Sequence, residues 1–561
     1  MTTKLISLLL ALTTALSGFC SNAAGALRSF GLQIGLYTDE SGAFLTELDD
    51  KEVSQFDDNT GYLKNTLLVF FDETANLFDR VSILGKANAV AVGSLRAARL
   101  YVLRTAGCNY EQLAQKAEQL TALPGVALAS VCPARRIEPQ ATPNDPFAAD
   151  SSLYRVDWTE RYPSGNNWNM EAIDARRAWG YDAYYNEINV GIVDAGFQTD
   201  HPDLEGLISF PSARLARRNN ADDHGDHVAG IIAAKGNNGV GVCGLCQHCE
   251  LTCVDWSKEE GQSWLNDVAI FFGFGHAVKG GAKVINFSVG ATGSIKSEEY
   301  EYPKIYIALD AMLYSCYMSA LLFNGYDFIC VQSAGNGNED GYAVDALQNT
   351  LFCSITKNNA FTPFFGVSAQ SLMDRIIIVG SARLESGAYY QASSSNVGDQ
   401  VNICAPGVNI FSCITEDGYG YMSGTSMAAP HVTAIAAMVW SVNPKLTAGE
   451  VKKIVCSSTK DTVQIAKTRY FEDLNYKEYP MVNAALSVET ALKTIGGVSV
   501  TLPFTADPDS TVVLTDEQGR TFEFEADKQG KVSVVLLPGA YTAAYSVLRL
   551  PHGADFSVEN S

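Results

Sequence analysis

Three short, almost continuously apolar segments, separated by helical stretches, restrict the fold of this chain more than any other feature. The segments are residues 188–196 (INVGIVDAG), 282–290 (AKVINFSVG) and 327–336 (DFICVQSAGN). Strands that are apolar on both faces and alternate with helices indicate an α/β fold, a parallel sheet with helices on both faces. Functional residues of such sheets cluster at the carboxyl ends of the strands. Asp194, Ser288 and Asn336 occupy these ends.

A fourth segment, residues 424–440 (GTSMAAPHVTAIAAMVW), predicts a buried helix that begins near a serine. Proline is tolerated only in the first turn of a helix, so Pro430 indicates a start near Ser426. Asn443 and Pro444 mark the end of the helix. Because the amino end of a helix carries partial positive charge, Ser426 stands where an oxyanion is stabilised. Such a serine requires a base and an orienting acid elsewhere in the chain.

The length and composition of the chain argue against several classes of protein. A chain of 561 residues is expected to contain about two to four domains, and 47% hydrophobic residues suffice for a large core. A net charge of −22 argues against nucleic acid or an anionic membrane surface as a partner. No segment after the amino terminus is long and apolar enough to predict a membrane span.

The amino-terminal residues predict export. Lys4 precedes the apolar run LISLLLALTTAL and small residues follow near Ala23, so we expect residues 1–24 to be a signal peptide. The protein is then secreted or periplasmic. Cys20 leaves lipid anchoring open as an alternative, although Phe19 before it fits lipid attachment poorly. The other cysteines of an exported protein are free to form disulfides.

Changes of pattern along the chain predict three domains after the signal peptide. Residues 27–140 combine strand segments (LLVFF, LRAARLYVLRT from Leu95, and VALASV) with a helical segment, which indicates a small α+β domain. The stretch 139–147 (PQATPNDPF) is expected to be an exposed linker. Residues 150–495 contain the predicted parallel sheet. Residues 496–561 alternate apolar and polar residues between turns, which predicts about five or six antiparallel strands in a small all-β domain.

Three short motifs contain residue types that act together in acyl transfer. They are VDAG at Asp194, DHGDHVAG at His224 and GTSMAAP at Ser426. A serine hydroxyl becomes an effective nucleophile when an imidazole takes its proton, and a carboxylate orients that imidazole. The side-chain amide of Asn336, in a strand-end loop, is suited to stabilise the oxyanion. The order Asp, His, Ser differs from the orders of chymotrypsin and the α/β-hydrolases.

With this order and these motifs, residues 150–495 resemble the subtilases, the subtilisin-like serine proteases of peptidase family S8. Further matching segments are HPDL (201–204), NNGVGVCG (237–244), VINFSVG, SAGN (333–336) and CAPG (404–407). The resemblance implies a subtilisin-like fold and a serine endopeptidase that hydrolyses polypeptides through an acyl-enzyme. It implies Asp194 as the orienting acid, His224 as the general base and then acid, Ser426 as the nucleophile and Asn336 as an oxyanion donor.

The same resemblance implies how substrate and precursor are handled. Extended substrate pairs with Ser288, Val289 and Gly290, and Ser333, Ala334 and Gly335 line the pocket for the residue before the scissile bond. Residues 27–140 resemble an inhibitory propeptide that is cut away near 139–147, and residues 496–561 resemble the β-sandwich appendages of secreted enzymes. Because subtilases are commonly monomers and often contain structural calcium, we expect a monomer that requires no cofactor, with calcium as the candidate structural ion.

Asp226 departs from the family pattern, which usually has threonine two residues after the base. If its carboxylate faced His224, it would raise the pKa of the imidazole. We favour a side chain that faces solvent or caps the helix. The segment 337–371, which contains Cys353, is longer than expected after Asn336 and is a candidate wall of the substrate cleft.

Four cysteines have the C-x2-C-x2-C-x3-C spacing of bacterial iron–sulfur proteins. They are Cys243, Cys246, Cys249 and Cys253. The segment runs into a predicted core strand, whose side chains point alternately to opposite faces, and no proline follows the fourth cysteine. We therefore favour local disulfides, with free buried thiols and an iron–sulfur or zinc site as alternatives.

Two further histidines near the predicted triad, His227 and His431, could act as a metal ligand or as a base. One cluster is compatible with a metal site; it consists of Asp222, Asp223, His224, Asp226 and His227. We expect His227 to be a packed structural histidine instead. His431 shares the helix of Ser426, but at five residues' distance it faces another side, so we expect a structural hydrogen bond.

Two other functions stay open. A non-enzymatic descendant of the family would use the fold for binding or adhesion, although this sequence retains every triad and oxyanion residue. A redox protein requires that the four cysteines hold an iron–sulfur cluster.

Overall fold

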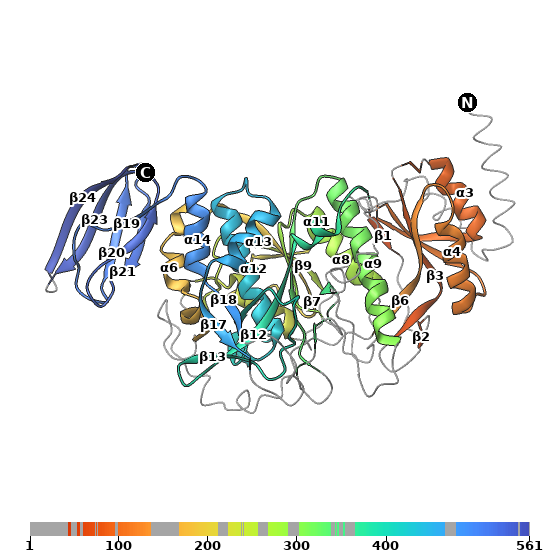
Figure 1. Ribbon diagram of the computed structural model, residues 1–561, viewed down its shortest axis with the longest axis horizontal. Coiled ribbons are helices and arrows are strands. Elements are labelled where there is room, and N and C mark those ends of the chain that lie inside the picture. Colours follow the sequence, from red (N-terminus) through yellow and green to blue (C-terminus); the bar gives the residue numbers. More distant parts are fainter. Residues whose placement is uncertain are drawn as a thin grey trace.

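The structure of the protein is a computed structural model that describes most of the chain. The described residues are 43–45, 53–55, 60–72, 74–75, 77–95, 99–135, 168–210, 223–236, 238, 241–255, 267–289, 302–337, 343, 345–346, 350, 352–353, 365–465, 478–547 and 550–559. The predicted signal peptide at 1–24, with Cys20, and the predicted linker at 139–147 lie outside them. Figure 1 shows the described parts as three bodies in a row, with the central sheet between an α+β module and a β domain.

Within the described residues, ten strands form the central sheet, in the order β13-β17-β18-β14-β12-β11-β10-β7-β9-β8. Every neighbouring pair from β8 to β18 in this order is parallel, whereas β17–β18 and β12–β13 are antiparallel. The bounds are β7 Ile188–Asp194, β8 Ile208–Ser209, β9 Cys249–Asp255, β10 Val284–Phe287, β11 Ile329–Ser333, β12 Ile376–Glu385, β13 Ala388–Gln391, β14 Ile403–Pro406, β17 Thr459–Gln464 and β18 Glu478–Val482. The predicted parallel sheet is therefore confirmed, with an antiparallel edge.

Helices cover both faces of this sheet, because its strands are apolar on both sides. One face carries α5 Trp168–Ala172, α6 Ala175–Trp179, η3 Asp182–Tyr184, α7 His224–Ala233, α12 Thr425–Val442, α13 Ala448–Ser457, α14 Ala484–Lys493 and the hairpin β15 Ile410–Ile414 and β16 Gly418–Met422. The other face carries α8 Asp267–Lys279, α9 Tyr302–Phe323 and α11 Ala369–Met373. No helix in the described part of the chain combines the length and apolar character that a bilayer span requires.

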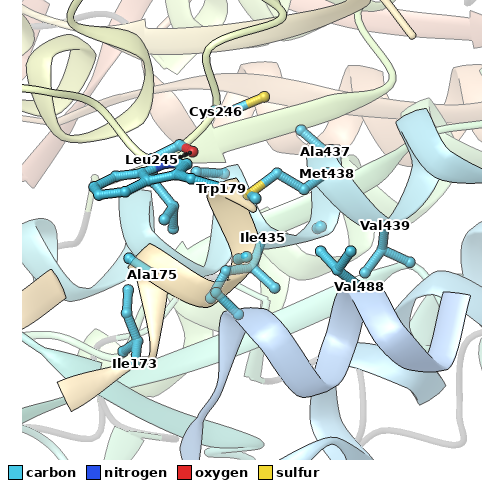
Figure 2. Close-up of a cluster of buried hydrophobic side chains, with 14 of the residues drawn as sticks. Ile173, Ala175, Trp179, Leu245, Cys246, Ile435, Ala437, Met438, Val439 and Val488 are labelled. Carbon is cyan, nitrogen blue, oxygen red and sulfur yellow. Dashed lines mark hydrogen bonds between the residues drawn. The ribbon is translucent and has the colours of Figure 1, made fainter. Parts of the chain in front are cut away.

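The helix α12 is buried along its whole length. Its side chains pack against α6, α14 and the segment before β9, as Figure 2 shows for Met438, Val488 and Trp179. The indole Nε1 of Trp179 donates to the carbonyl oxygen of Leu245 at 2.8 Å, which ties the segment before β9 to this cluster. A helix enclosed on all sides keeps its first turn at a fixed position relative to the sheet.

The amino-terminal module has two helices on one face of an antiparallel sheet. Its elements are β1 Ala43–Leu45, β2 Val53–Gln55, β3 Thr60–Phe71, α3 Leu77–Ala87, β4 Ala89–Leu95, β5 Leu100–Thr105, α4 Tyr110–Thr121 and β6 Val126–Arg135. Alternate residues of β3 point to opposite faces: Leu67 and Val69 pack under the helices, whereas Leu68 and Phe70 pack on the central body beside α8 and α9. The strand predicted from Leu95 is wrong in its start, since β5 begins only after Arg99, which has φ 51°.

Six antiparallel strands form the described part of the carboxyl-terminal domain, in sheets β19-β22 and β21-β20-β23-β24. Their bounds are β19 Val498–Thr501, β20 Thr511–Asp516, β21 Thr521–Glu525, β22 Ser533–Leu536, β23 Gly539–Val547 and β24 Leu550–Val558. This domain shares a hydrophobic core with the central body. At the contact, a Cβ on Gly180 would lie 2.3 Å from the carbonyl oxygen of Glu523, so only glycine permits this approach.

Candidate active site

The carboxyl edge of the central sheet carries the three residues of the predicted triad. Asp194 is the last residue of β7, and His224 is the first residue of α7. Ser426 lies in the first turn of α12, which packs against α7. The three residues are 0%, 2% and 0% exposed, in that order. A sheet end and two helix amino termini thus converge on one buried site.

A short hydrogen bond joins His224 to Asp194. The imidazole Nδ1 lies 2.6 Å from Asp194 Oδ1, and the same oxygen accepts the backbone N–H of Ala195 at 2.7 Å. Since a carboxylate only accepts hydrogen bonds, Nδ1 carries the proton and Nε2 keeps the lone pair. Asp194 therefore occupies the position of an orienting acid, and His224 that of a base.

Ser426 makes two hydrogen bonds with Ser288, which follows β10. Its Oγ donates to the carbonyl oxygen of Ser288 at 3.4 Å, and Ser288 Oγ donates to the carbonyl oxygen of Ser426 at 3.1 Å. The second bond replaces a helical one, because Pro430 has no N–H to donate four residues back. Pro430 lies in the second turn of α12, so its predicted place in the first turn is wrong. The helix tolerates it because the Ser288 hydroxyl donates to the buried Ser426 carbonyl that Pro430 leaves without a backbone donor.

The side-chain amide of Asn336 is oriented by Thr425. Its Oδ1 accepts the backbone N–H of Thr425 at 2.8 Å and the Thr425 hydroxyl at 2.9 Å. Because a backbone N–H only donates, this contact fixes which end of the amide is oxygen. The buried Nδ2 then has no hydrogen-bond partner among the described residues. A buried donor without a partner, next to the first turn of α12, is the arrangement that an oxyanion site requires.

The predicted substrate-binding residues lie on neighbouring strand ends. Ser288 and Val289 follow β10, and Ser333 ends β11, followed by Ala334 and Gly335. Gly290 lies outside the described residues. The two strands are adjacent and parallel, so both segments border the site.

Part of the long segment after Asn336 packs behind these strand ends. The hydroxyl of Thr350 donates to the carbonyl oxygen of Ala334 at 2.6 Å, and the N–H of Phe352 donates to Gln332 Oε1 at 3.1 Å. Cys353, which also belongs to the segment 337–371, is buried next to these two residues. The hydrogen bonds of Thr350 and Phe352 therefore hold the end of β11 and the loop of Ala334 in place.

The prediction that Asp226 faces solvent or caps its helix is wrong. Asp226 is 0% exposed, and its Oδ1 accepts the backbone N–H of Gln198 at 2.8 Å. The reason is that α7 packs closely on the loop after β7, where the N–H of Gly225 donates to the carbonyl oxygen of Ala195 at 2.7 Å. A sequence pattern contains no information about that enclosure.

Both neighbouring histidines are structural, as predicted. His227 Nε2 donates to the carbonyl oxygens of Ile410 at 2.9 Å and Gly420 at 3.2 Å, and burial followed by the nearby His224 lowers its pKa to about 3. His431 is also buried, which lowers its pKa to about 4. Its Nδ1 lies 2.8 Å from the carbonyl oxygen of Met427. Both imidazoles are therefore neutral at pH 7.

The four spaced cysteines do not meet at one centre. Cys246 and Cys249 form a disulfide, and Cys243 and Cys253 are thiols. Cys253 lies inside β9, where burial raises its pKa well above the usual range of a thiol. Of the predicted acidic cluster, Asp222 lies outside the described residues. Among those that are described, no three His, Cys, Asp or Glu side chains group closely enough to hold a metal ion.

Three residues of the site were missed from the sequence. Thr425 orients Asn336, and Asn396 supports the same loop by donating from Nδ2 to the carbonyl oxygen of Ala334 at 2.9 Å. Asp255 ends β9 beside Asp194. Its place at the carboxyl end of an apolar strand was the only available signal for it.

Comparison with known proteins places this site in one family. A model of the subtilase family matches residues 186–479, the range that contains Asp194, His224, Asn336 and Ser426. Subtilisin DY from Bacillus licheniformis is 30% identical over 287 residues, which cover 51% of this chain and 87% of that protein. The thermophilic serine proteinase of Bacillus sp. strain AK1 is 27% identical over 300 residues, and the chain spans 63% of its length.

A solved structure resembles most of this chain in fold. Fervidolysin from Fervidobacterium pennivorans, described as a keratinolytic enzyme related to subtilisin, has a TM-score of 0.56 and 20% sequence identity. The match covers 92% of this chain and 80% of fervidolysin. At this identity the comparison establishes the fold, which agrees with the predicted subtilisin-like architecture.

Proposed function

The chain belongs to the subtilase family, and on that premise we propose that it is a serine endopeptidase that hydrolyses peptide bonds of polypeptides. Asp194, His224 and Ser426 form the catalytic triad of this proposal, and Asn336 is its oxyanion donor. The observation that carries it is the fixed orientation of two groups: the Asp194–His224 pair with its 2.6 Å bond, and the Asn336 amide with Nδ2 as donor.

In the first half-reaction, His224 Nε2 takes the proton of Ser426 Oγ as Oγ bonds to the carbonyl carbon of the substrate. The carbonyl oxygen becomes an oxyanion, to which Asn336 Nδ2 and the backbone N–H of Ser426 donate. Asp194 stabilises the imidazolium but does not itself take up a proton. Collapse of the intermediate breaks the C–N bond, and the imidazolium gives its proton to the leaving amine, which leaves an acyl-enzyme.

In the second half-reaction, water replaces the amine. His224 takes a proton from water while the hydroxide adds to the ester carbon, and the same oxyanion site stabilises the second intermediate. The bond to Ser426 Oγ then breaks and the oxygen recovers its proton from the imidazolium. The residues supply every proton transfer, so the reaction requires no cofactor. No step involves calcium.

Covalent labelling tests the proposal directly. A fluorophosphonate reacts only with an activated serine, so the purified protein should be labelled once per chain and Ser426→Ala should not be labelled. Ser441→Ala is a matched control, because Ser441 lies at the far end of the same buried helix, where its hydroxyl donates to the carbonyl oxygen of Asn186. Absence of labelling and of peptide hydrolysis in the matured wild-type protein would favour a binding module instead.

We further propose that the protein is made as an exported precursor. Residues 1–24 serve as the signal peptide, and the module at 27–140 serves as an intramolecular inhibitor that is removed by cleavage near 139–147. Support comes from the module's apolar face, where Leu68, Phe70 and Val102 share a buried cluster with residues of α8 and α9. Ser426→Ala should therefore accumulate as an uncut precursor.

The carboxyl-terminal domain is proposed to stabilise the catalytic body of a monomeric enzyme. Glu489 on α14 accepts from Tyr181 at 2.8 Å and from Arg177 Nε at 2.7 Å. Tyr181 and Arg177 also contact β22. The N–H of Val535 donates to the Tyr181 hydroxyl at 3.0 Å, and Arg177 donates to the carbonyl oxygen of Ser533 at 2.8 Å. This polar junction lies beside a shared hydrophobic core, so truncation after residue 495 should lower Tm.

A further inference from the structure

The loop 195–198, which follows Asp194, is fastened by buried carboxylates on three elements. Each carboxylate accepts one backbone N–H of the loop. Among the described residues these bonds are Ala195 N to Asp194 Oδ1 (2.7 Å), Gly196 N to Asp255 Oδ1 (3.3 Å) and Gln198 N to Asp226 Oδ1 (2.8 Å). The three carboxylates are 0%, 1% and 0% exposed. Only one of them, Asp194, belongs to the proposed triad.

The sheet register places two of these carboxylates side by side. β7 and β9 are parallel, with Asp194 paired to Asp255 and Ile192 paired to Cys253. Ile192 and Cys253 face the core under α7 and α12, whereas Val193 faces the opposite core. Side chains two residues apart on a strand share a face, so Asp194 and Asp255 point toward α7. The helix contributes the third carboxylate, Asp226.

The loop and α7 are in such close contact that neither shifts without the other. The N–H of Gly225 donates to the carbonyl oxygen of Ala195 at 2.7 Å. A Cβ on Gly225 would lie 2.4 Å from the carbonyl oxygen of Gly196, a distance that no other residue tolerates. Gly225 directly follows His224. The position of the loop therefore sets the position of the imidazole.

Titratable groups lie on α7 and on each of the elements that pack against it. They are Asp194 on β7, Cys253 and Asp255 on β9, Cys413 on β15, His224 and His227 on α7 itself, and His431 on α12. Burial raises the pKa of the Cys253 thiol, and the carboxylate of Asp226 raises it further. Burial also raises the pKa of the Cys413 thiol, followed by the carboxylates of Asp203 and Asp226, so both thiols are neutral at pH 7. His227 and His431 are neutral at pH 7 as well. The cluster is acidic apart from the imidazole of His224.

We propose that Asp226 and Asp255 are positioning residues for the Asp194–His224 pair. They hold the loop that sets the imidazole in place, and the charge of Asp226 favours the imidazolium that forms during catalysis. The inference rests on the proposed peptidase activity, since it concerns the same base. Asp226 and His224 are 0% and 2% exposed, so the charge of Asp226 acts through the protein interior rather than across solvent.

Two variants of Asp226 separate geometry from charge. Asp226→Asn keeps an oxygen that accepts the Gln198 N–H but removes the charge, and Asp226→Ala removes both. With the charge gone, the imidazolium is less favoured, so the acidic limb of the kcat/KM profile should move to lower pH. We expect a shift of about 0.5–1 pH unit for Asp226→Asn, with kcat at the plateau within about 3-fold of wild type. Asp226→Ala should lower kcat about 10–100-fold with little change in KM, because the imidazole loses its fixed position.

The matched control is Asp516→Asn in the carboxyl-terminal domain. Asp516 is also a mostly buried carboxylate that accepts backbone N–H groups, from Gln518 at 3.0 Å and Arg520 at 2.9 Å. Its substitution should lower Tm and leave the acidic limb in place. Asp255→Ala should lower kcat more than KM, as Asp226→Ala does, because the N–H of Gly196 loses the oxygen that accepts it.

The outcomes distinguish the two proposals. A wild-type protein without peptide hydrolysis overturns the proposed function and this inference with it. An active wild type whose Asp226→Asn profile coincides with its own, or shifts as Asp516→Asn does, overturns the inference alone. If Asp226→Ala does not fold, the pH profile of Asp226→Asn decides, because that variant conserves shape and the hydrogen bond to Gln198.

Discussion

The hydroxyl of Ser288 donates to the carbonyl oxygen of Ser426 at 3.1 Å and so supplies the bond that α12 lacks there. The helix lacks it because Pro430 has no N–H. Ser288 Oγ in turn accepts from Asn286 Nδ2 at 2.9 Å, and Asn286 Oδ1 accepts from Thr433 at 2.9 Å. A chain of buried hydrogen bonds thus runs from β10 to the backbone of the proposed nucleophile.

Ser288→Ala should show what this chain contributes. The substitution leaves the Ser426 carbonyl buried without its donor, which costs about 1–3 kcal/mol of unfolding free energy. It also loosens the first turn of α12, so we expect kcat to fall about 10-fold while KM changes less. Chemical denaturation and steady-state kinetics on a peptide substrate measure the two effects. Ser315→Ala is a control, since its hydroxyl donates to the Ala311 carbonyl within α9. Unchanged kcat in Ser288→Ala would contradict the positioning role.

Asn336→Asp tests the oxyanion donor without breaking the loop. The carboxylate still accepts from Thr425 as the amide oxygen does, but it presents an oxygen where Nδ2 donates. We expect kcat to fall by at least about 10²–10³-fold, the magnitude known for loss of the equivalent donor in subtilisin rather than one calculated for this chain. Asn402→Asp is a control at the opposite edge of the sheet, where Asn402 accepts the Ile378 N–H. If kcat fell equally in Asn336→Asp and Asn402→Asp, the loss would come from lower protein stability and not from the missing oxyanion donor.

Most of the fold and the triad were predictable because their signals are local. Apolar strand runs that end in Asp194 and Asn336, and a helix that starts near Ser426, each occupy a few consecutive residues. Their physical reason is the burial of the sheet on both faces, which forces continuous apolar runs. Where such a run ends, a polar side chain stands out.

The remaining features depend on residues far apart in the sequence. Asp226 is buried by the loop after β7, and Pro430 is accommodated by Ser288, more than a hundred residues away. The break at Arg99 is a left-handed residue inside an apolar run, which no periodicity reveals. Spacing alone also left the pairing of Cys246 with Cys249 open, since several arrangements of nearby cysteines are sterically equivalent.

The buried neutral histidines should make the protein sensitive to acid. In the unfolded chain a histidine binds a proton below about pH 6.5, whereas folded His431 does so only near its pKa of about 4. The unfolded state therefore binds more protons between these values, and stability falls as pH falls through this window. For His431 the loss by pH 4.5 is roughly 2–3 kcal/mol, and His227, with a pKa of about 3, adds to it.

Denaturation of the Ser426→Ala background, which avoids self-digestion, measures this loss at pH 7 and pH 4.5. His431→Gln should be less stable at pH 7, because it loses the contacts of the imidazole with Met427 and Asn169. Its unfolding free energy should nevertheless fall less between pH 7 and pH 4.5, because the unfolded variant has no imidazole at position 431 to take up a proton. A decline as steep as that of the parent would contradict the assignment of a depressed pKa.

The contact of Arg99 with the central body predicts how tightly the amino-terminal module binds. The guanidinium lies over the rings of Phe323, at 5.2 Å, and Phe365, at 5.9 Å, and donates to the Asp72 carbonyl at 2.9 Å. The module has its own hydrophobic core, so it can be supplied as a separate chain of residues 27–140.

Arg99→Ala in that chain should raise the inhibition constant against the matured enzyme about 3–10-fold, the effect of one cation–π contact. Phe323→Ala in the enzyme should also weaken binding of the wild-type module, and the two changes together should add little to Arg99→Ala alone, because both remove the Arg99–Phe323 contact. Lys116→Ala is the control, since Lys116 bonds to the Ala87 carbonyl within the module on the α4 side. Full additivity of Arg99→Ala and Phe323→Ala would show that the two residues act independently, and a module that fails to inhibit at all would refute its proposed role as the inhibitor.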